Sequence, residues 1–145
     1  MDTVFSASFL LVLPFWLLMI FLPTWRFTER VMRSPWTAAP AGVLYAVLVL
    51  PRLPEVLGAV ANPDLSGVAA LLSSPAGTTI GWVHFLAFDL FVARWAYLES
   101  RERGLNPFVM APVLFVVLML GPVGFLAYLA VRGTLGARAV PEAVL

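Results

Sequence analysis

Three ionisable side chains, His84, Asp89 and Arg94, lie inside one long apolar stretch of the sequence, with Asp89 close to its midpoint. A carboxyl or an imidazole held in such a place can give or take a proton, and burial moves the pKa of a carboxyl towards neutrality. Placing Asp or Arg at the centre of a membrane helix costs ~2.5–3.5 kcal/mol, which a structural helix avoids by using Leu. We therefore take these residues as candidates for a functional site.

Each of the three residues also has a structural interpretation. Asp89 can be a neutral carboxyl that hydrogen-bonds a neighbouring helix and fixes its packing, and His84 can pack at a helix interface rather than act as a ligand, acid or base. Arg94 lies within reach of lipid headgroups and can extend its side chain towards them, so the structural interpretation is favoured for it.

The spacing of these residues separates their side chains. They are five residues apart, so at ~100° per residue each step turns ~140° around a helix, and no single small pocket follows from this helix alone. We expect each group to meet a partner from another helix, with the hydroxyls of Tyr45 and Tyr128 as candidates.

The same stretch is rich in aromatic residues. Those near its ends fit the aromatic belt at a membrane interface, whereas those near its middle could line a groove for a flat, apolar, conjugated ligand or simply pack against other helices. Two glycine pairs, Gly77/Gly81 and Gly121/Gly124, are weak signals of close helix contact. The aromatic residues are Trp82, Phe85, Phe88, Phe91 and Trp95.

Metals and cofactors find little support in the sequence. One histidine and scattered carboxylates do not supply three metal ligands at helical spacing, and a haem bound by His84 would lack a second protein ligand. The absence of Cys excludes disulfides and iron–sulfur clusters, and all nine basic residues are Arg, which excludes a Schiff-base lysine. We expect no metal and no cofactor.

The composition identifies the class of protein. Hydrophobic residues make up 61% of the 145 residues and charged residues only 12%, with a mean hydropathy of +0.95. Soluble domains carry about 25% charged residues, so the outer surface of this chain must face lipid. A net charge of +1 without a basic run indicates no nucleic-acid partner.

The apolar stretches predict an all-α integral membrane protein, a single domain over residues 1–145 in the form of a four-transmembrane-helix bundle. A crossing helix needs ~20 residues. The first stretch has no positive residue before it, so we read it as retained rather than as a signal peptide. The expected spans are residues 5–25, 40–60, 79–98 and 108–131, the third capped by Thr78 or Thr79 and the fourth interrupted at Gly121-Pro122-Val123-Gly124.

The segments between the spans are short. Residues 26–33 are expected to form a charged loop, and residues 99–104 a turn of mixed charge. The second span either stops near Leu50 or continues with a kink past Arg52. Asn62-Pro63-Asp64 begins a short helix over 63–72, capped by Asn62, which is either interfacial or re-entrant.

Arginine counts suggest a direction of insertion. Five arginines flank the first and third connections and three lie on the opposite side, which places both termini outside the cytoplasm. The composition, Arg-rich and Ala-rich, favours a multi-pass protein of a bacterial cytoplasmic membrane.

The second half of the chain resembles a known family. The run from Gly77 to Trp95, the segment Glu99 to Gly104, and Gly121-Pro122-Val123-Gly124-Phe125-Leu126 are similar to the signature of the abscisic-acid-deficient-four-like family, a family of four-helix membrane proteins. The first half matches mainly in layout. Plant members are needed to make neoxanthin, an allenic carotenoid derived from violaxanthin.

The resemblance implies isomerisation of a carotenoid epoxide, which requires an acid at the epoxide oxygen and a base at a carbon-bound proton. On this hypothesis His84 and Asp89 are the catalytic pair, and Arg94 orients the substrate or stabilises charge on it. The expected substrate-binding residues are Trp82, Phe85, Phe88, Trp95 and Tyr45. The expected partners are membrane lipid, a carotenoid or related isoprenoid, and a second copy or another membrane protein.

A second hypothesis makes the chain a non-catalytic helper or subunit of a larger membrane complex. Its small size, lone histidine and close-packing glycines suit this role. A transporter ranks third, because a single four-helix unit would need to dimerise to form a path.

Overall fold

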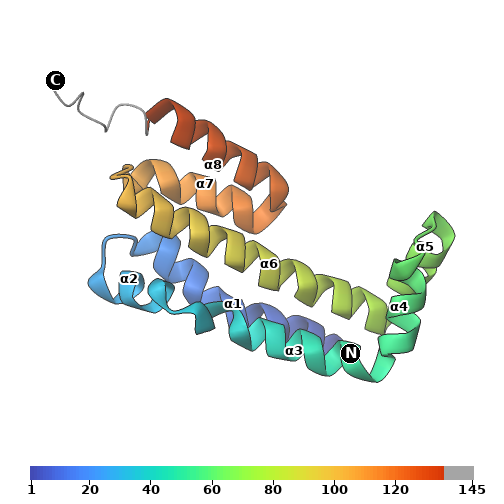
Figure 1. Cartoon of the computed structure of the whole chain (residues 1–145). Helices are drawn as coiled ribbons and strands as arrows, with labels where there is room; N and C mark the ends of the chain where they lie inside the picture. The colour runs from blue at the N-terminus through green and yellow to red at the C-terminus, as the bar shows by residue number, and fades with distance from the viewer. Residues whose placement is uncertain (136–145) are drawn as a thin grey trace, which may run out of the picture. The chain divides into compact units, whose positions relative to one another are not determined.

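The computed structural model of the protein describes residues 1–135 as a set of helices, with no strand in that part of the chain (Figure 1). The all-α prediction is confirmed for these residues. The α-helices are α1 (Asp2–Phe21), α2 (Arg26–Arg33), α3 (Ala39–Val49), α4 (Leu53–Ala61), α5 (Leu65–Ser73), α6 (Pro75–Glu102), α7 (Pro107–Leu120) and α8 (Pro122–Leu135), and short 3₁₀ turns are η1 (Pro35–Ala38) and η2 (Leu50–Arg52).

Three helical stretches are long and apolar enough to cross a membrane: Asp2–Phe21, Pro35–Ala61 and Pro75–Glu102. Their surfaces carry many exposed large apolar side chains, which a protein surface in water rarely collects to this extent. This is the surface expected of a chain in lipid. Insertion and the four-span bundle stay predictions.

The chain divides into two compact units. Unit 1 contains Met1–Leu13 and Ala38–Phe88, and unit 2 contains Pro14–Thr37 and the chain from Asp89 onward. The helices α1 and α6 contribute residues to both units. In unit 1, α4 packs with α5, and in unit 2, α7 lies side by side with α8 (Figure 1).

The second stretch settles an alternative that the sequence left open. Helix α3 does not end the span at Leu50, because η2 continues it into α4. Pro51 lies in η2 and Pro54 near the start of α4, and the exposed Arg52 pairs with Glu55 at 3.2 Å. The span therefore continues with a kink.

The expected fourth helix is two helices. Gly121, with a φ of +30°, ends α7, and α8 begins at Pro122. A Cβ on Gly124 would lie 2.2 Å from the Val117 backbone nitrogen, so the glycine allows the two helices to touch. The expected single helix over 108–131 is corrected to a hairpin of two helices, and its place in the membrane stays a prediction.

Two other boundaries differ because the capping residues were misassigned. The Asp64 carboxylate accepts the Gly67 backbone N–H at 2.9 Å, so Asp64, and not Asn62, caps α5. The Ser74 hydroxyl accepts the Gly77 backbone N–H at 3.0 Å, which starts α6 at Pro75 and places Thr78 and Thr79 inside the helix. At its other end α6 continues through Glu102, so most of the expected turn over 99–104 is helical.

The expected charged loop over residues 26–33 is the helix α2. Glu29 and Arg33 are four residues apart and form an ion pair at 2.8 Å along the helix. Thr28 and Met32 are buried, so the short helix has an inner face as well as a charged outer one. The density of charged residues over 26–33 suggested a loop, but the spacing of four residues between Glu29 and Arg33 is typical of a helix.

Candidate functional site

Helix α6 carries all three predicted ionisable residues. Its buried face is apolar and includes Val83, Leu86, Leu90 and Ala93. His84, Asp89 and Arg94 lie beside this face and are half-buried. Because α6 is one regular α-helix over this region, the side chains of His84 and Asp89 leave it ~140° apart, as their spacing predicted.

His84 lies among aromatic rings in unit 1. Its imidazole stacks on Phe88, with ring centroids 4.7 Å apart and planes 29° apart, and it meets the Tyr45 ring of α3 at 5.4 Å. Phe85 lies edge-on at 6.2 Å. We call Tyr45, His84, Phe85 and Phe88 the His84 cluster. The structure brings together these four of the predicted site residues.

The His84 cluster is open on one side. Phe85 and Phe88 each expose 60% of their surface, while Tyr45 and His84 are half-buried. The His84 imidazole is a group that can act as an acid or as a base, and it lies against flat apolar rings. This arrangement suits proton transfer to or from a flat, apolar ligand lying on the exposed rings.

Trp82 faces a different neighbour in unit 1. Its ring stacks on Phe5 of α1, with centroids 5.3 Å apart and planes 29° apart. The indole Nε1 is buried and has no hydrogen-bond partner within residues 1–135. Its observed contact is therefore helix packing, and its role against a ligand stays a prediction.

Asp89 packs against the break between α7 and α8 in unit 2. A Cβ built on Gly121 would lie 2.5 Å from the Asp89 Oδ1 and 3.3 Å from its Cγ. Only a glycine leaves room for the carboxyl group at this point. The Asp89 carboxyl therefore lies against the α7–α8 junction.

Arg94 contacts the end of α2 within unit 2. One terminal nitrogen of its guanidinium donates to the Arg33 backbone carbonyl at 3.2 Å, and its Nε is buried without a hydrogen-bond partner in the described part of the chain. The last carbonyls of a helix lack partners in the helix itself, so Arg94 caps α2. This contact is structural.

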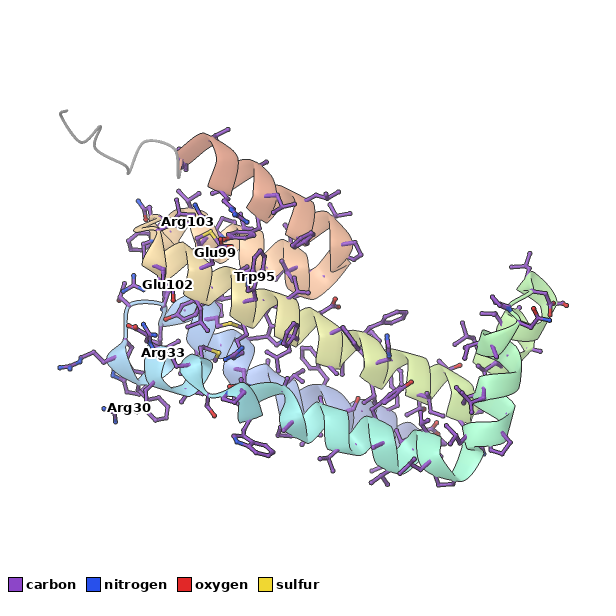
Figure 2. The ribbon with its side chains drawn as sticks, in the orientation of Figure 1. Arg30, Arg33, Trp95, Glu99, Glu102 and Arg103 are labelled. Atoms are coloured by element: carbon purple, nitrogen blue, oxygen red, sulfur yellow. The ribbon has the colours of Figure 1, made fainter. Side chains whose placement is uncertain are left out.

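Trp95 and Tyr128 belong to a cluster that the sequence did not reveal. Trp95 meets Tyr128 edge-on at 5.3 Å and Phe125 at 5.9 Å. The Tyr128 hydroxyl donates to Glu99 at 2.7 Å, so this hydroxyl serves Glu99 rather than the three residues for which it was a candidate. Figure 2 shows Trp95, Glu99 and Arg103 near one another in unit 2.

Glu99 is the centre of that cluster and was missed. Its carboxylate also pairs with Arg103 at 2.9 Å and with Arg132 at 3.4 Å. The spacing of Glu99 and Arg103, four residues apart, was an available signal for a helix. No local sequence pattern predicts the contact between Glu99 and Arg132, because it forms only when the hairpin at Gly121 brings α8 back beside α6. Within residues 1–135, no three His, Cys, Asp or Glu side chains gather as a metal site.

Comparison with known proteins identifies similar sequences. The family described as ABA DEFICIENT 4-like matches residues 3–128. The protein "ABA DEFICIENT 4, chloroplastic" from Arabidopsis thaliana is 31% identical over 137 residues, which cover 90% of this chain. The match covers 61% of the plant protein, so the chain spans less than two thirds of that relative. No solved structure is significantly similar to the chain.

Proposed function

Because the chain belongs to the ABA DEFICIENT 4-like family, we propose that it is an integral membrane protein that isomerises a carotenoid epoxide or a related isoprenoid. The family connection is to neoxanthin synthesis in plants. The exposed apolar helices support a location where such a substrate dissolves. The observation that carries the proposal is the stacking of His84 on Phe88 and beside Tyr45.

The proposed reaction exchanges protons without an oxidant. The epoxide oxygen receives a proton as its carbon–oxygen bond breaks. A base removes a proton from a nearby carbon, and the electron pair of that carbon–hydrogen bond forms the new carbon–carbon double bond. One proton is gained and one is lost, so the product is an isomer of the substrate.

His84 is the proposed acid–base residue, because the aromatic rings around it give a polyene a surface to lie on. Phe85 and Phe88 would contact the polyene, and Tyr45 would hold the imidazole. Asp89 is the second candidate for the acid or the base. Arg94 is the candidate for orienting the substrate. Their contacts with Gly121 and Arg33 give each of them a packing role as the alternative.

The test uses the full chain in a host that makes a carotenoid epoxide. We expect a new isomer in the pigment extract and a visible absorption band in the purified protein. General acid–base catalysis contributes ~10²–10⁴-fold, so His84→Gln should lower product at least ~100-fold while the protein stays folded. Asp89→Asn gives the same loss if the carboxyl moves a proton, and leaves the product unchanged if it only packs.

Phe91→Leu is the matched control, because Phe91 is an exposed aromatic residue of α6 outside the His84 cluster. Full product formation by a folded His84→Gln protein would overturn the assignment to His84.

A second function, a helper in a membrane complex, is favoured by the glycines of the second stretch. No atom of the described residues lies within 4 Å of the position of a Cβ on Gly42 or Gly58, so this part of the chain leaves both sites open to another helix. This function predicts no product from the chain alone and a stoichiometric partner in native detergent extracts.

A further inference from the structure

Helix α2 is a short amphipathic helix with a basic outer face. Thr28 and Met32 are completely buried, whereas Arg26, Phe27 and Arg30 are exposed. The helix follows α1 directly, at the end of the first candidate span. It therefore lies where a membrane protein meets the headgroup layer.

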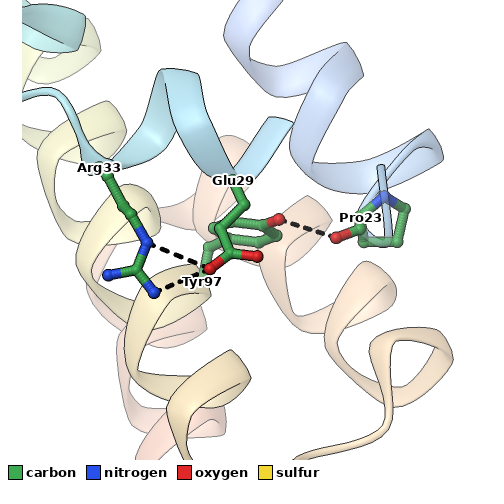
Figure 3. Close-up of polar contacts among 4 residues, drawn as sticks. All are labelled: Pro23, Glu29, Arg33 and Tyr97. Atoms are coloured by element: carbon green, nitrogen blue, oxygen red, sulfur yellow. Dashed lines mark hydrogen bonds and ion pairs between the residues drawn. The ribbon is translucent and has the colours of Figure 1, made fainter. Parts of the chain in front are cut away.

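Side chains from within unit 2 hold α2 in place. The Thr28 hydroxyl donates to the Leu22 carbonyl at 2.7 Å, and the buried Tyr97 of α6 donates to the Pro23 carbonyl at 2.7 Å (Figure 3). At the other end of α2, Arg94 binds the Arg33 carbonyl. The helix and the turn before it are thus fixed to α6 at both ends, and the outer face is presented in one orientation.

The charge of the outer face is not balanced within the structure. Glu29 is paired with Arg33 (Figure 3), and Arg26 and Arg30 form no ion pair with any residue in 1–135. The hydrogen bond from Arg33 has the largest effect and lowers the pKa of Glu29, desolvation raises it, and the charges of Arg33, Arg101 and Arg26 lower it further. Arg101 therefore adds positive charge near α2, while the negative charge of Glu102 acts on Arg33 and leaves Arg26 and Arg30 without an ion-pair partner in residues 1–135.

Aromatic residues lie beside the free arginines. Trp25 and Phe27 touch with ring centroids 4.9 Å apart, and they expose 51% and 46% of their surfaces. Trp25 also lines an open hollow of about 480 Å³ with Phe21, Leu22 and Thr24. Exposed Trp next to Arg at the end of an apolar span is the arrangement found at the membrane–water interface.

We propose that α2 is an interfacial anchor that binds anionic lipid headgroups through Arg26 and Arg30, with Trp25 and Phe27 in the region between headgroups and acyl chains. Charge complementarity selects the occupant, because the two unpaired guanidinium groups suit phosphate oxygens. The inference does not depend on the isomerase activity proposed above.

The experiment measures the lipid retained by the intact chain. Protein in neutral detergent is titrated with phosphatidylglycerol or with phosphatidylcholine, and bound lipid is counted by native mass spectrometry. We expect phosphatidylglycerol to bind more tightly. Each arginine near an anionic headgroup contributes about fivefold in affinity, so Arg26→Gln with Arg30→Gln should lower the affinity about 25-fold.

The matched control is Arg52→Gln, which removes an exposed arginine from unit 1 and should change the affinity less than about twofold. Trp25→Ala tests the aromatic part and should weaken both lipids alike. Unchanged binding of phosphatidylglycerol by the folded double variant would overturn the proposal. So would displacement of the lipid by millimolar inorganic phosphate, which would indicate a site for the free anion.

Discussion

The Tyr128 hydroxyl donates a hydrogen bond of 2.7 Å to the Glu99 carboxylate, and the Tyr128 side chain is completely buried. Arg103 and Arg132 contact the other oxygen of the same carboxylate. This cluster joins α8 to α6 through one carboxylate.

Tyr128→Phe should therefore destabilise the protein. A hydrogen bond to a charged group contributes ~1.5–3 kcal/mol, and its loss also leaves one Glu99 oxygen without its partner. Tyr97→Phe, which loses the neutral bond to Pro23, should cost ~0.5–1.5 kcal/mol. The measurement is the unfolding midpoint in detergent, followed by circular dichroism.

The third tyrosine is the control for both variants. Tyr45 makes no hydrogen bond through its hydroxyl within residues 1–135, so Tyr45→Phe should leave the midpoint almost unchanged. Equal midpoints for all three variants would contradict the importance of the Glu99 cluster.

Gly121→Ala should destabilise the α7–α8 turn for two separate reasons. The φ of +30° strains any residue with a Cβ by ~1–2 kcal/mol, and the new methyl group would collide with Asp89. The double variant Gly121→Ala with Asp89→Ala removes the collision and keeps the strain, so its loss of stability should be smaller than the sum of the losses of the two single variants. Gly133→Ala is the control in the same helix pair, because no atom of residues 1–135 lies within 4 Å of its Cβ position. Full stability of Gly121→Ala would show that Asp89 does not need the glycine.

The Asp64 cap predicts a dependence of stability on pH. Hydrogen bonds from Ser66 and then from the Gly67 backbone lower the pKa of Asp64 below its ordinary value of 3.8. A carboxyl whose pKa is lower in the folded state stabilises the fold above pH 3.8, and this contribution is lost as the pH falls through the lower folded value.

Asp64→Asn separates the charge from the cap, because Asn also accepts the hydrogen bond of an N-cap. This variant should keep α5 and lose the pH-dependent part of the unfolding midpoint below pH 3.8. Asp64→Ala should lose both. A folded Asp64 that titrates at 3.8 or above by carbon-13 NMR would contradict the prediction.

Arg94→Gln should loosen the end of α2. The Arg33 carbonyl would lose its guanidinium partner, so amide exchange in the last turn of α2 should speed up while α7 and α8 keep their protection. Unchanged exchange over 30–33 would mean that Arg94 is not needed as a cap. If the variant loses the isomer product while amide exchange in α2 is unchanged, Arg94 would be assigned to substrate orientation instead.

Hydropathy and helical spacing predicted much of this fold. The three long apolar stretches and the divergence of His84 from Asp89 follow directly from composition and from ~100° per residue. Tyr45 was expected to offer its hydroxyl from another helix; its ring lies near His84, but its hydroxyl makes no hydrogen bond within residues 1–135. The glycines Gly77 and Gly124 do mark close backbone approaches, to Leu71 and Val117.

What could not be predicted depends on contacts between distant segments. Glu99 was read as part of a charged turn, because nothing near it in sequence indicates Tyr128 or Arg132. The charges of residues 26–33 suggested a loop, since the buried partners of Thr28 and Met32 are not local. At the N-termini of α5 and α6, more than one nearby polar residue could cap the helix by sequence alone. The structure shows that Asp64 caps α5, not Asn62, and that Ser74 caps α6, not Thr78.

The hairpin at Gly121 changes the expected sidedness of the chain. At ~1.5 Å per residue the 14 residues of α7 or of α8 extend ~21 Å, short of the ~30 Å of a bilayer core. The Arg132–Glu99 pair places the end of α8 beside the end of α6. If the hairpin enters and leaves the membrane at one face, the number of crossings is odd, and we therefore predict that Thr3 and Thr134 lie in opposite compartments.

With an odd number of crossings, the distribution of arginines between the two faces predicts a direction of insertion more clearly. Of the eight arginines in residues 1–135, we predict that six lie on the cytoplasmic face, with Arg52 on the opposite face and Arg94 inside α6. The six are Arg26, Arg30, Arg33, Arg101, Arg103 and Arg132. Because the chain has no cysteine, Thr3→Cys and Thr134→Cys can be labelled one at a time with an impermeant thiol reagent on intact cells. We expect label only at position 3. Label at both positions would restore an even number of crossings.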